Sequence, residues 1–264
     1  MAGPGCTPET VDQNIGGSLK DFWNKGWQRT RVIRERNTAW FIQKLWHAGK
    51  AIRHDPDFLI FLVRCGWTNE SHGRGRRSTI RWRNGHLAEY LNVDLETDAL
   101  ETVVAAKLPS LKTDATRMIR IETGITHCYG AVRAVTLDFV ERQPDTIASA
   151  FLEVASRRLG PQEKLRRILN LVNREFTNRA GRKINILNGL TPTLACLDPA
   201  RRFPIMNAKT KPLLKELGVQ PDYEGAVALY RQIGAHKIKD SFELDVYAAT
   251  QFRGRRRKRR AGVA

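Results

Sequence analysis

From residue 85 onward, apolar residues recur every three or four positions, which is the period of an α-helix. The clearest case is 162–177, in which Leu165, Ile168 and Val172 follow this spacing. Prolines and glycines separate the periodic segments, as they commonly do between helices. The pattern predicts helices at 97–108, 115–121, 129–139, 144–159, 162–177, 212–217, 221–233 and 241–252, with an earlier one at 37–52. We therefore expect an all-α protein.

The first third of the chain contains all six tryptophans, and several arginines are interleaved with them. In the predicted helix 37–52, Trp40, Leu45 and Trp46 recur at helical spacing. Aromatic residues at this spacing most often form a hydrophobic core. The alternative is that they stack on exposed bases, with the arginines binding phosphates. The sequence leaves both interpretations open.

Residues 66–84 interrupt the helical pattern with glycines and a dense set of arginines. Arg74, Arg76 and Arg77 lie in this stretch, which is typical of a loop that contacts phosphates. A surface loop without such a role is the alternative. We divide the chain into a Trp-rich basic region at 1–84, a helical core at 85–252 and a basic tail at 253–264.

The chain is strongly basic, with 45 Lys and Arg against 27 Asp and Glu and a formal net charge of +18. The tail supplies seven of these cations, among them Arg255, Arg256 and Arg257, so the rest of the chain still carries +11. A field of this size attracts polyanions, of which nucleic acid is the most common. A solubility surface and a nuclear address are alternatives for the tail. We expect the tail to be disordered and to contact DNA.

Several classes of protein are disfavoured by the absence of their motifs. The four cysteines are far apart and the six histidines lack metal-site spacing, so we expect no metal and no disulfide framework. Neither a glycine-rich nucleotide loop nor an apolar run of membrane-spanning length occurs, and the first residues do not resemble a signal peptide. The expectation is a cofactor-free, cytoplasmic, nucleoid-associated monomer.

The most specific string lies between Ile184 and Leu213. Within it, Asn188-Gly189-Leu190-Thr191-Pro192 predicts a tight turn between two short helices. Backbone N–H groups at the start of the second helix would then form a phosphate site. We expect Asn188, Gly189 and Thr191 to contact DNA there.

This segment resembles the helix-hairpin-helix superfamily of base-excision DNA glycosylases. Gly189-Leu190-Thr191 stands at the place of the hairpin, and 197–207, LDPARRFPIMN, is similar to the following Asp-Pro-x-x-Phe-Pro-Ile-x-Asp segment. The resemblance covers about 162–218. It implies a two-lobed helical fold and hydrolysis of the N-glycosidic bond of a modified or damaged base in double-stranded DNA. Some members of the group remove modified bases from viral DNA, which implies a role in defence against phage.

Two positions depart from the family pattern. Thr191 replaces the second hairpin glycine, and Asn207 stands where the resemblance implies a catalytic aspartate. Because an asparagine carries no charge, it cannot stabilise a developing positive charge on the sugar as a carboxylate does. The sequence therefore leaves open a second function, that of a non-catalytic DNA-binding module such as a restriction-system or nucleoid component. Binding of single-stranded RNA is a third hypothesis.

Candidate catalytic residues are taken from this same region. Asp198 is a candidate carboxylate, although its place before Pro199 also suits a helix end. Asn207 would orient a water, and Lys209 would attack the sugar as an amine or bind phosphate. Lys211 is a predicted phosphate contact. Four further carboxylates are alternatives to the missing aspartate: Glu224, Asp240, Glu243 and Asp245.

A second polar cluster lies at 120–130 and contains two glycines. Glu122, His127 and Tyr129 would line a pocket that reads the edge of a base and stacks on its face. The alternative is a corner between two helices, stabilised by an ion pair.

Overall fold

The structure is a computed structural model, and it describes seven parts of the chain. They are 32–67 without 33–34, 37–38, 41 and 48, then 136–172 without 137, then 176–177, 183–184, 186–206, 210–233 and 238–248. Residues 68–84 of the Arg-rich loop, the 120–130 cluster, the predicted helices 97–108 and 115–121 and the basic tail therefore lie outside the described residues. The interruption predicted to begin at 66 was placed too early, because α3 extends to Trp67.

Helices dominate the described residues, which confirms the all-α prediction at that level. The labelled helices are η1 (Gly49–Ile52), α3 (Pro56–Trp67), α7 (Pro144–Ala155), α8 (Pro161–Val172), α9 (Leu187–Leu197), α10 (Thr210–Glu216) and α11 (Tyr223–Ile233). Residues 42–47, 138–142 and 241–248 are also helical. A two-residue antiparallel pair, β1 (Phe176–Thr177) with β2 (Lys183–Ile184), is the exception.

Proline begins three of these helices, at Pro56, Pro144 and Pro161. Proline suits the first helical position because its fixed φ is helical and its missing N–H would have no partner there. Asp55 adds a cap to α3, since its Oδ1 accepts the N–H groups of Asp57 at 2.8 Å and Phe58 at 3.1 Å. The helix predicted at 144–159 is shorter in the structure and ends at Ala155. The helix predicted at 162–177 begins at Pro161 and ends at Val172, and Phe176–Thr177 forms β1 instead.

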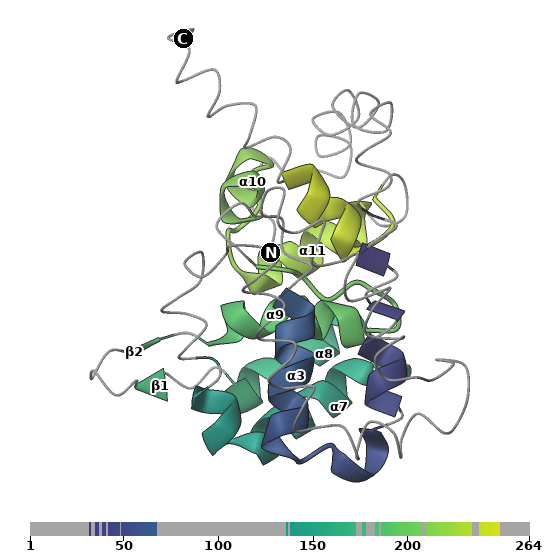
Figure 1. Ribbon diagram of the computed structural model, residues 1–264. Coiled ribbons are helices and arrows are strands. Elements are labelled where there is room, and N and C mark those ends of the chain that lie inside the picture. Colours follow the sequence, from purple (N-terminus) through teal and green to yellow (C-terminus); the bar gives the residue numbers. More distant parts are fainter. Residues whose placement is uncertain are drawn as a thin grey trace, which may run out of the picture.

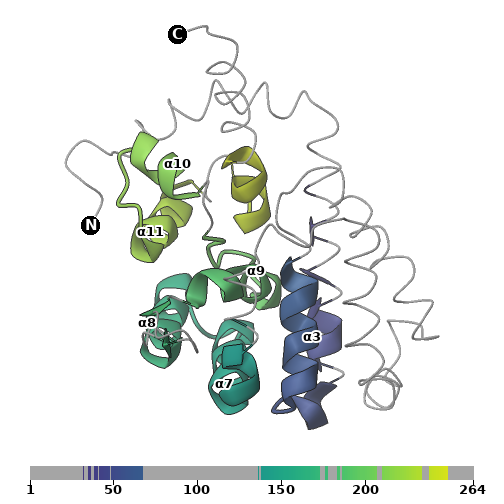
Figure 2. The same cartoon turned by 60° about the vertical axis from the view of Figure 1, so that its left-hand side comes forward.

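Helix α9 lies at the centre of the molecule. In Figures 1 and 2, α3, α7 and α8 lie below it, whereas α10, α11 and the helical segment 241–248 lie above it. Helix α9 packs against both α3 and α7, and α8 packs against α7 and α11. Its burial follows from its sequence, since every residue of α9 except Asn188 is buried.

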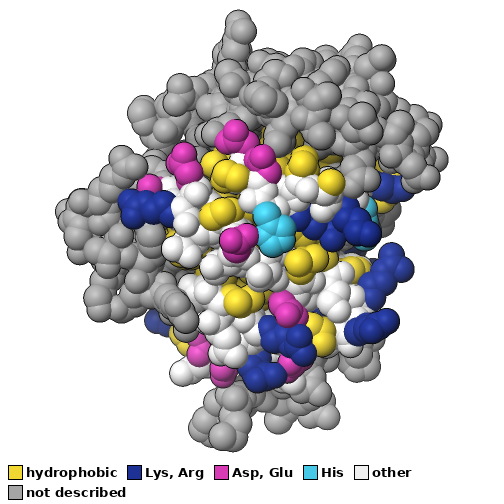
Figure 3. All heavy atoms as spheres, turned by 90° about the horizontal axis from the view of Figure 1, so that it is seen from below, with side chains coloured by type: hydrophobic (Ala, Val, Ile, Leu, Met, Phe, Trp, Pro, Cys, Tyr) yellow, Lys and Arg dark blue, Asp and Glu magenta, His cyan; other side chains and the backbone are white. Residues whose placement is uncertain are grey.

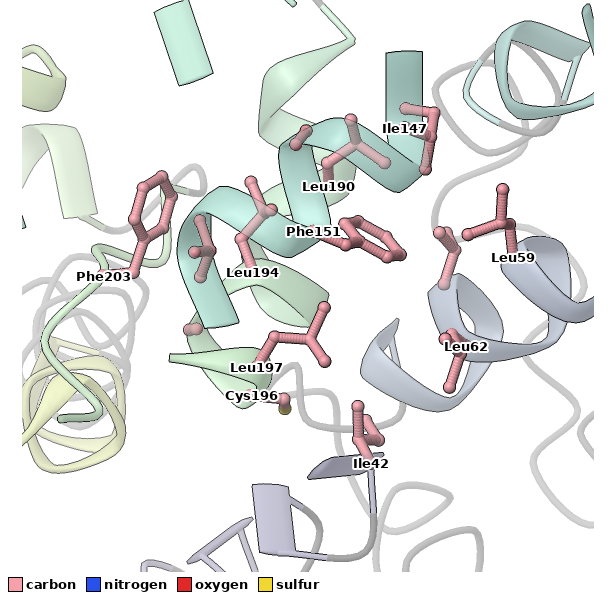
Figure 4. Close-up of a cluster of buried hydrophobic side chains, with 14 of the residues drawn as sticks. Ile42, Leu59, Leu62, Ile147, Phe151, Leu190, Leu194, Cys196, Leu197 and Phe203 are labelled. Atoms are coloured by element: carbon pink, nitrogen blue, oxygen red, sulfur yellow. The ribbon is translucent and has the colours of Figure 1, made fainter. Parts of the chain in front are cut away.

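Two hydrophobic clusters stabilise the fold. The first core cluster joins the segment 39–63 to α7, α8 and α9, and Figure 4 shows Leu59, Phe151 and Leu194 converging in it. The second core cluster joins α10, α11 and 241–248. Ile205 belongs to the first cluster and Met206 to the second, so the two clusters meet at this peptide bond. Helix α11 and the segment 241–248 also reach the first cluster, through Val227 and Phe242.

Residues from the predicted N-terminal region share the first core cluster with residues from the predicted helical core. Trp46, for example, is 2% exposed and makes an edge-on contact with Phe151 of α7 at 5.7 Å between ring centroids. This confirms the core interpretation for Trp46. Trp40 is 38% exposed, so the same interpretation does not hold for it.

Candidate functional site

The Asp198 loop, residues 198–206, connects α9 to the segment leading to α10. Asp198 follows the last residue of α9 in an extended conformation. Its Oδ2 accepts the backbone N–H groups of Arg202 at 2.7 Å and Phe203 at 2.9 Å, and its Oδ1 accepts that of Ala200 at 3.3 Å. One carboxylate thus closes the loop upon itself, as aspartates commonly do in turns.

A buried ion pair holds this loop against the rest of the first core cluster. Lys164 of α8 donates from Nζ to Oδ1 of Asp198 at 2.6 Å, and both side chains are at most 3% exposed. Four donors therefore surround the Asp198 carboxylate. This arrangement favours a structural role for Asp198 at the end of α9 over the predicted catalytic role.

The far side of the Asp198 loop is bonded to the helical segment 241–248. Ser241 donates its hydroxyl to the carbonyls of Phe203 at 2.5 Å and Arg201 at 2.9 Å, and its backbone N–H bonds to Arg201 O at 2.7 Å. Arg201 has a positive φ of 54°, a conformation that few residues other than glycine adopt. The Asp198 loop is thus held by Lys164 on one side and by Ser241 on the other.

The turn predicted at 188–192 is not formed, because α9 runs without interruption from Leu187 to Leu197. Proline inside a helix removes the bond to the carbonyl four residues earlier, here that of Asn188. The Thr191 hydroxyl replaces it by donating to Asn188 O at 3.0 Å, and it also accepts the N–H of Met206 at 3.1 Å. Thr191 therefore lets the helix continue through Pro192.

The phosphate contacts predicted for Gly189 and Thr191 do not fit this arrangement, because both residues are buried. A Cβ at Gly189 would lie 2.3 Å from the Thr136 hydroxyl, which shows how closely α9 is packed there. Asn188 is half-buried, and its side-chain oxygen accepts the hydroxyl of Tyr223 from α11. The side chains of 188–191 therefore hold helices together.

Three of the alternative carboxylates gather at the start of the helical segment 241–248. Asp240, Glu243 and Asp245 are all buried, at 2% to 4% exposure. Asp240 accepts the N–H of Glu243 at 3.0 Å, and Glu243 accepts the N–H of Lys239 at 2.7 Å, an arrangement close to a capping box. Asp240 and Glu243 therefore stabilise a helix start.

Arg36 binds two of these carboxylates from the other end of the chain. Its Nε lies 2.6 Å from Asp240 Oδ2, and its Nη2 lies 2.5 Å from Glu243 Oε1. Burial raises the pKa of Glu243, as does the neighbouring charge of Asp240, although Arg36 opposes this rise. The sequence shows the Asp-x-x-Glu pattern but gives no sign of a partner 204 residues away.

The remaining predicted site residues fall into two groups. Lys211 is exposed on α10, in keeping with the predicted phosphate contact, and Glu224 is exposed on α11. The others lie outside the described residues: Asn207, Lys209, Glu122, His127, Tyr129, Arg74, Arg76, Arg77, Arg255, Arg256 and Arg257.

Among the described residues, no group of three or more His, Cys, Asp or Glu side chains is arranged to hold a metal ion. In the same residues, no helix has the length and apolar character needed to cross a membrane. Comparison of the chain with protein-family models, with curated proteins and with solved structures gave no match.

Proposed function

We propose that the protein binds double-stranded DNA and acts on it as a DNA glycosylase-like enzyme that hydrolyses the N-glycosidic bond of a modified or damaged base. The observation that carries this proposal is the Asp198 loop. Its sequence resembles the segment that precedes the catalytic position in helix-hairpin-helix glycosylases, and it is tied down by Lys164 and Ser241. A rigid support of this kind is what a positioned active-site residue needs.

The place of the loop in the fold also supports the proposal. The two core clusters meet at Ile205 and Met206, and Asn207 follows at once. Binding sites often form where two packed units of a protein meet. The net charge of +18 supplies the long-range attraction to DNA.

In the proposed reaction, water adds to the sugar carbon and the base leaves with the bonding electron pair and a proton. The products are a free base and an abasic site. The Asn207 side chain has no charge with which to stabilise the sugar cation. Its role would instead be to orient the attacking water through its amide group. Modified bases with good leaving ability are the substrates that suit such a site, and phage DNA is a source of them.

A second candidate is a DNA-binding module without catalytic activity. Asp198 favours it, because the carboxylate nearest to the catalytic position in the sequence is buried and engaged by Lys164 and by three backbone N–H groups. Asn207 also favours this candidate, because its side chain carries no charge that could stabilise a sugar cation. Both candidates require binding to duplex DNA, and they differ in whether a base is released.

A strand-nicking assay separates the two candidates. Purified protein is incubated with unmodified duplex DNA and with phage DNA that carries modified bases, and hot alkali then cleaves any abasic site. The enzyme is expected to give alkali-dependent breaks on the modified DNA, and Asn207→Ala is expected to abolish them. Arg166→Ala, on the exposed face of α8, is the matched control. Binding to both DNAs without breaks on either would identify the non-catalytic module.

A further inference from the structure

One face formed by the helical residues 39–40 and 42–47 combines an exposed aromatic ring with cations. Trp40, Lys44 and His47 are four and three residues apart, so they project from the same side of a helix. The Lys44 ammonium lies 5.7 Å from the centroid of the Trp40 ring, within the range of a cation–π contact. Trp40 and Leu152 are the large hydrophobic side chains that stand out as exposed among the described residues.

Arg53 adds a cation that is held in place by the core. Its guanidinium lies 4.6 Å from the centroid of the Trp46 ring, and its Nε and Nη2 both donate to Trp46 O at 3.2 Å. Trp46 is itself fixed between Phe58 and Phe151. Arg53 thus loses little side-chain entropy when it binds an anion, because its conformation is already set.

Arg157, just after the end of α7, places a further cation near the same face. The charges that act on His47 are those of Arg53, Arg157 and Lys44. Although His47 is exposed, partial burial lowers its pKa, and these three cations lower it further. The local potential is therefore positive, and an anion bound there would relieve the repulsion among these groups.

Figure 3 shows the molecule from below, and Lys and Arg side chains gather toward the right-hand edge of the described face. On α8, by contrast, Glu163 pairs with Arg166 and with Arg167, each at 2.7 Å, and Glu153 also pairs with Arg167 at 3.0 Å. Arginine side chains on α8 thus have carboxylate partners, whereas the described residues whose charges act on His47 are the cations Arg53, Arg157 and Lys44.

We propose that Trp40, Lys44, His47, Arg53 and Arg157 form a contact surface for the phosphate backbone of DNA, with the Trp40 ring lying against a sugar or base. We refer to these five residues as the Trp40 surface. An acidic peptide would supply negative charge but no flat ring beside each charge. A nucleotide carries phosphate and a flat, weakly polar base together, which matches an exposed indole flanked by cations.

The inference deepens the proposed function and rests on it, since both require DNA binding. It also goes beyond it, because the Trp40 surface lies in three segments that the resemblance to glycosylases does not cover: 39–47, the turn at Arg53 and the end of α7.

The test compares the full-length protein with Lys44→Ala/Arg157→Ala, measured on a fluorescent duplex of random sequence over a series of salt concentrations. Each lost phosphate contact lowers the slope of log K against log salt by about 0.9, so the double variant should lose roughly two units of slope. Affinity at about 0.1 M salt should fall by roughly tenfold or more. Arg142→Ala/Arg166→Ala removes two exposed arginines that are paired with carboxylates and should leave the slope unchanged.

Trp40→Ala separates the ring from the charge. It should weaken binding by roughly fivefold or more, in line with about 1–3 kcal/mol for stacking on a base, while leaving the salt slope intact. The inference would be overturned if the wild-type protein binds duplex DNA and the Lys44→Ala/Arg157→Ala variant binds it with the same affinity and the same salt slope. The proposed function would then still stand. Failure of the wild-type protein to bind any duplex would instead overturn the proposed function. If the same variants lose as much affinity for an acidic polypeptide as for duplex DNA, the Trp40 surface would be assigned to a protein partner.

Discussion

Lys164 Nζ, on α8, lies 2.6 Å from Oδ1 of Asp198, the residue that directly follows α9, and the two side chains are 3% and 1% exposed. The pair joins segments 34 residues apart and fixes the loop that leads toward Asn207. Removing one partner of a buried ion pair leaves an uncompensated charge, which costs more than the pair itself contributes.

We expect Asp198→Ala to lower the free energy of unfolding by about 3–5 kcal/mol, because the Lys164 charge and three backbone N–H groups lose their acceptor. Lys164→Met should cost less, since the carboxylate keeps its three backbone donors. Urea unfolding monitored by circular dichroism measures both changes.

Asp222→Ala is the matched control for this substitution. Asp222 is exposed and caps α11 by accepting the N–H of Gly225 at 2.7 Å, so its loss should cost only about 1 kcal/mol. If Asp198→Ala unfolds like the wild type but abolishes base release, then Asp198 is catalytic and the structural role is wrong.

Close packing between α3 and α9 gives a second prediction. A Cβ added at Gly66 would lie 2.8 Å from the backbone nitrogen of Thr193 and 2.1 Å from its hydroxyl. Because a helix backbone cannot move aside locally, Gly66→Ala should lower the free energy of unfolding by about 1–3 kcal/mol.

Gly160→Ala tests whether this effect comes from packing. A Cβ at Gly160 has no atom within 4 Å, so the substitution should change the free energy of unfolding by less than about 0.5 kcal/mol. Thermal unfolding of both variants measures the difference. Equal effects at the two glycines would contradict the contact between α3 and Thr193.

Local patterns predicted much of this fold, and distant contacts explain most of the rest. The apolar stripe of Leu165, Ile168 and Val172 correctly indicated α8. The turn expected around Pro192 was wrong, because the Thr191 hydroxyl replaces the missing bond to Asn188. That compensation depends on a side-chain conformation that local preferences for turns do not reveal.

The same limit applies to the candidate site. Asp198 was identified from the sequence, but its partner Lys164 lies on another helix, and a pairing of this kind leaves no periodic signal. The Trp40 surface was missed for a similar reason. The spacing of Trp40 and Lys44 was visible, whereas Arg157 joins them only through the packing of Trp46 on Phe151.

Arg36 provides a third prediction, which depends on pH. The folded state raises the pKa of Glu243, so it binds more protons than the unfolded state between the ordinary Glu pKa and the raised one. Stability is therefore lost as the pH rises through that window. Arg36→Ala removes the cation that opposes this rise, so the window should widen toward higher pH.

We expect Arg36→Ala to lower the free energy of unfolding by about 3 kcal/mol at pH 7, with a smaller loss near pH 4, where Glu243 is protonated. Glu243→Gln in the same background should restore part of the stability at pH 7. Unfolding by urea at both pH values measures these changes. A loss that does not depend on pH would show that the Arg36 contacts with Glu243 are not significant.

His47 gives the last prediction, which tests the Trp40 surface by a property that a merely structural residue lacks. Partial burial lowers the pKa of His47, and Arg53, Arg157 and Lys44 lower it further, so the free protein carries a neutral imidazole at pH 7. A bound phosphate would favour the protonated ring and raise this pKa again. DNA binding should therefore take up a proton, and affinity should increase as the pH falls below the ordinary His value of about 6.5.

The measurement is the dissociation constant for duplex DNA at pH 7.5 and pH 5.5, at constant salt, for the wild type and for His47→Gln. The glutamine keeps a polar side chain of similar size but has no proton to gain. The other five histidines contribute equally to both proteins, so the difference in pH dependence isolates His47. We expect the wild type to gain at least threefold more affinity than His47→Gln over this range. Identical pH dependence in the two proteins would place the phosphate backbone away from His47.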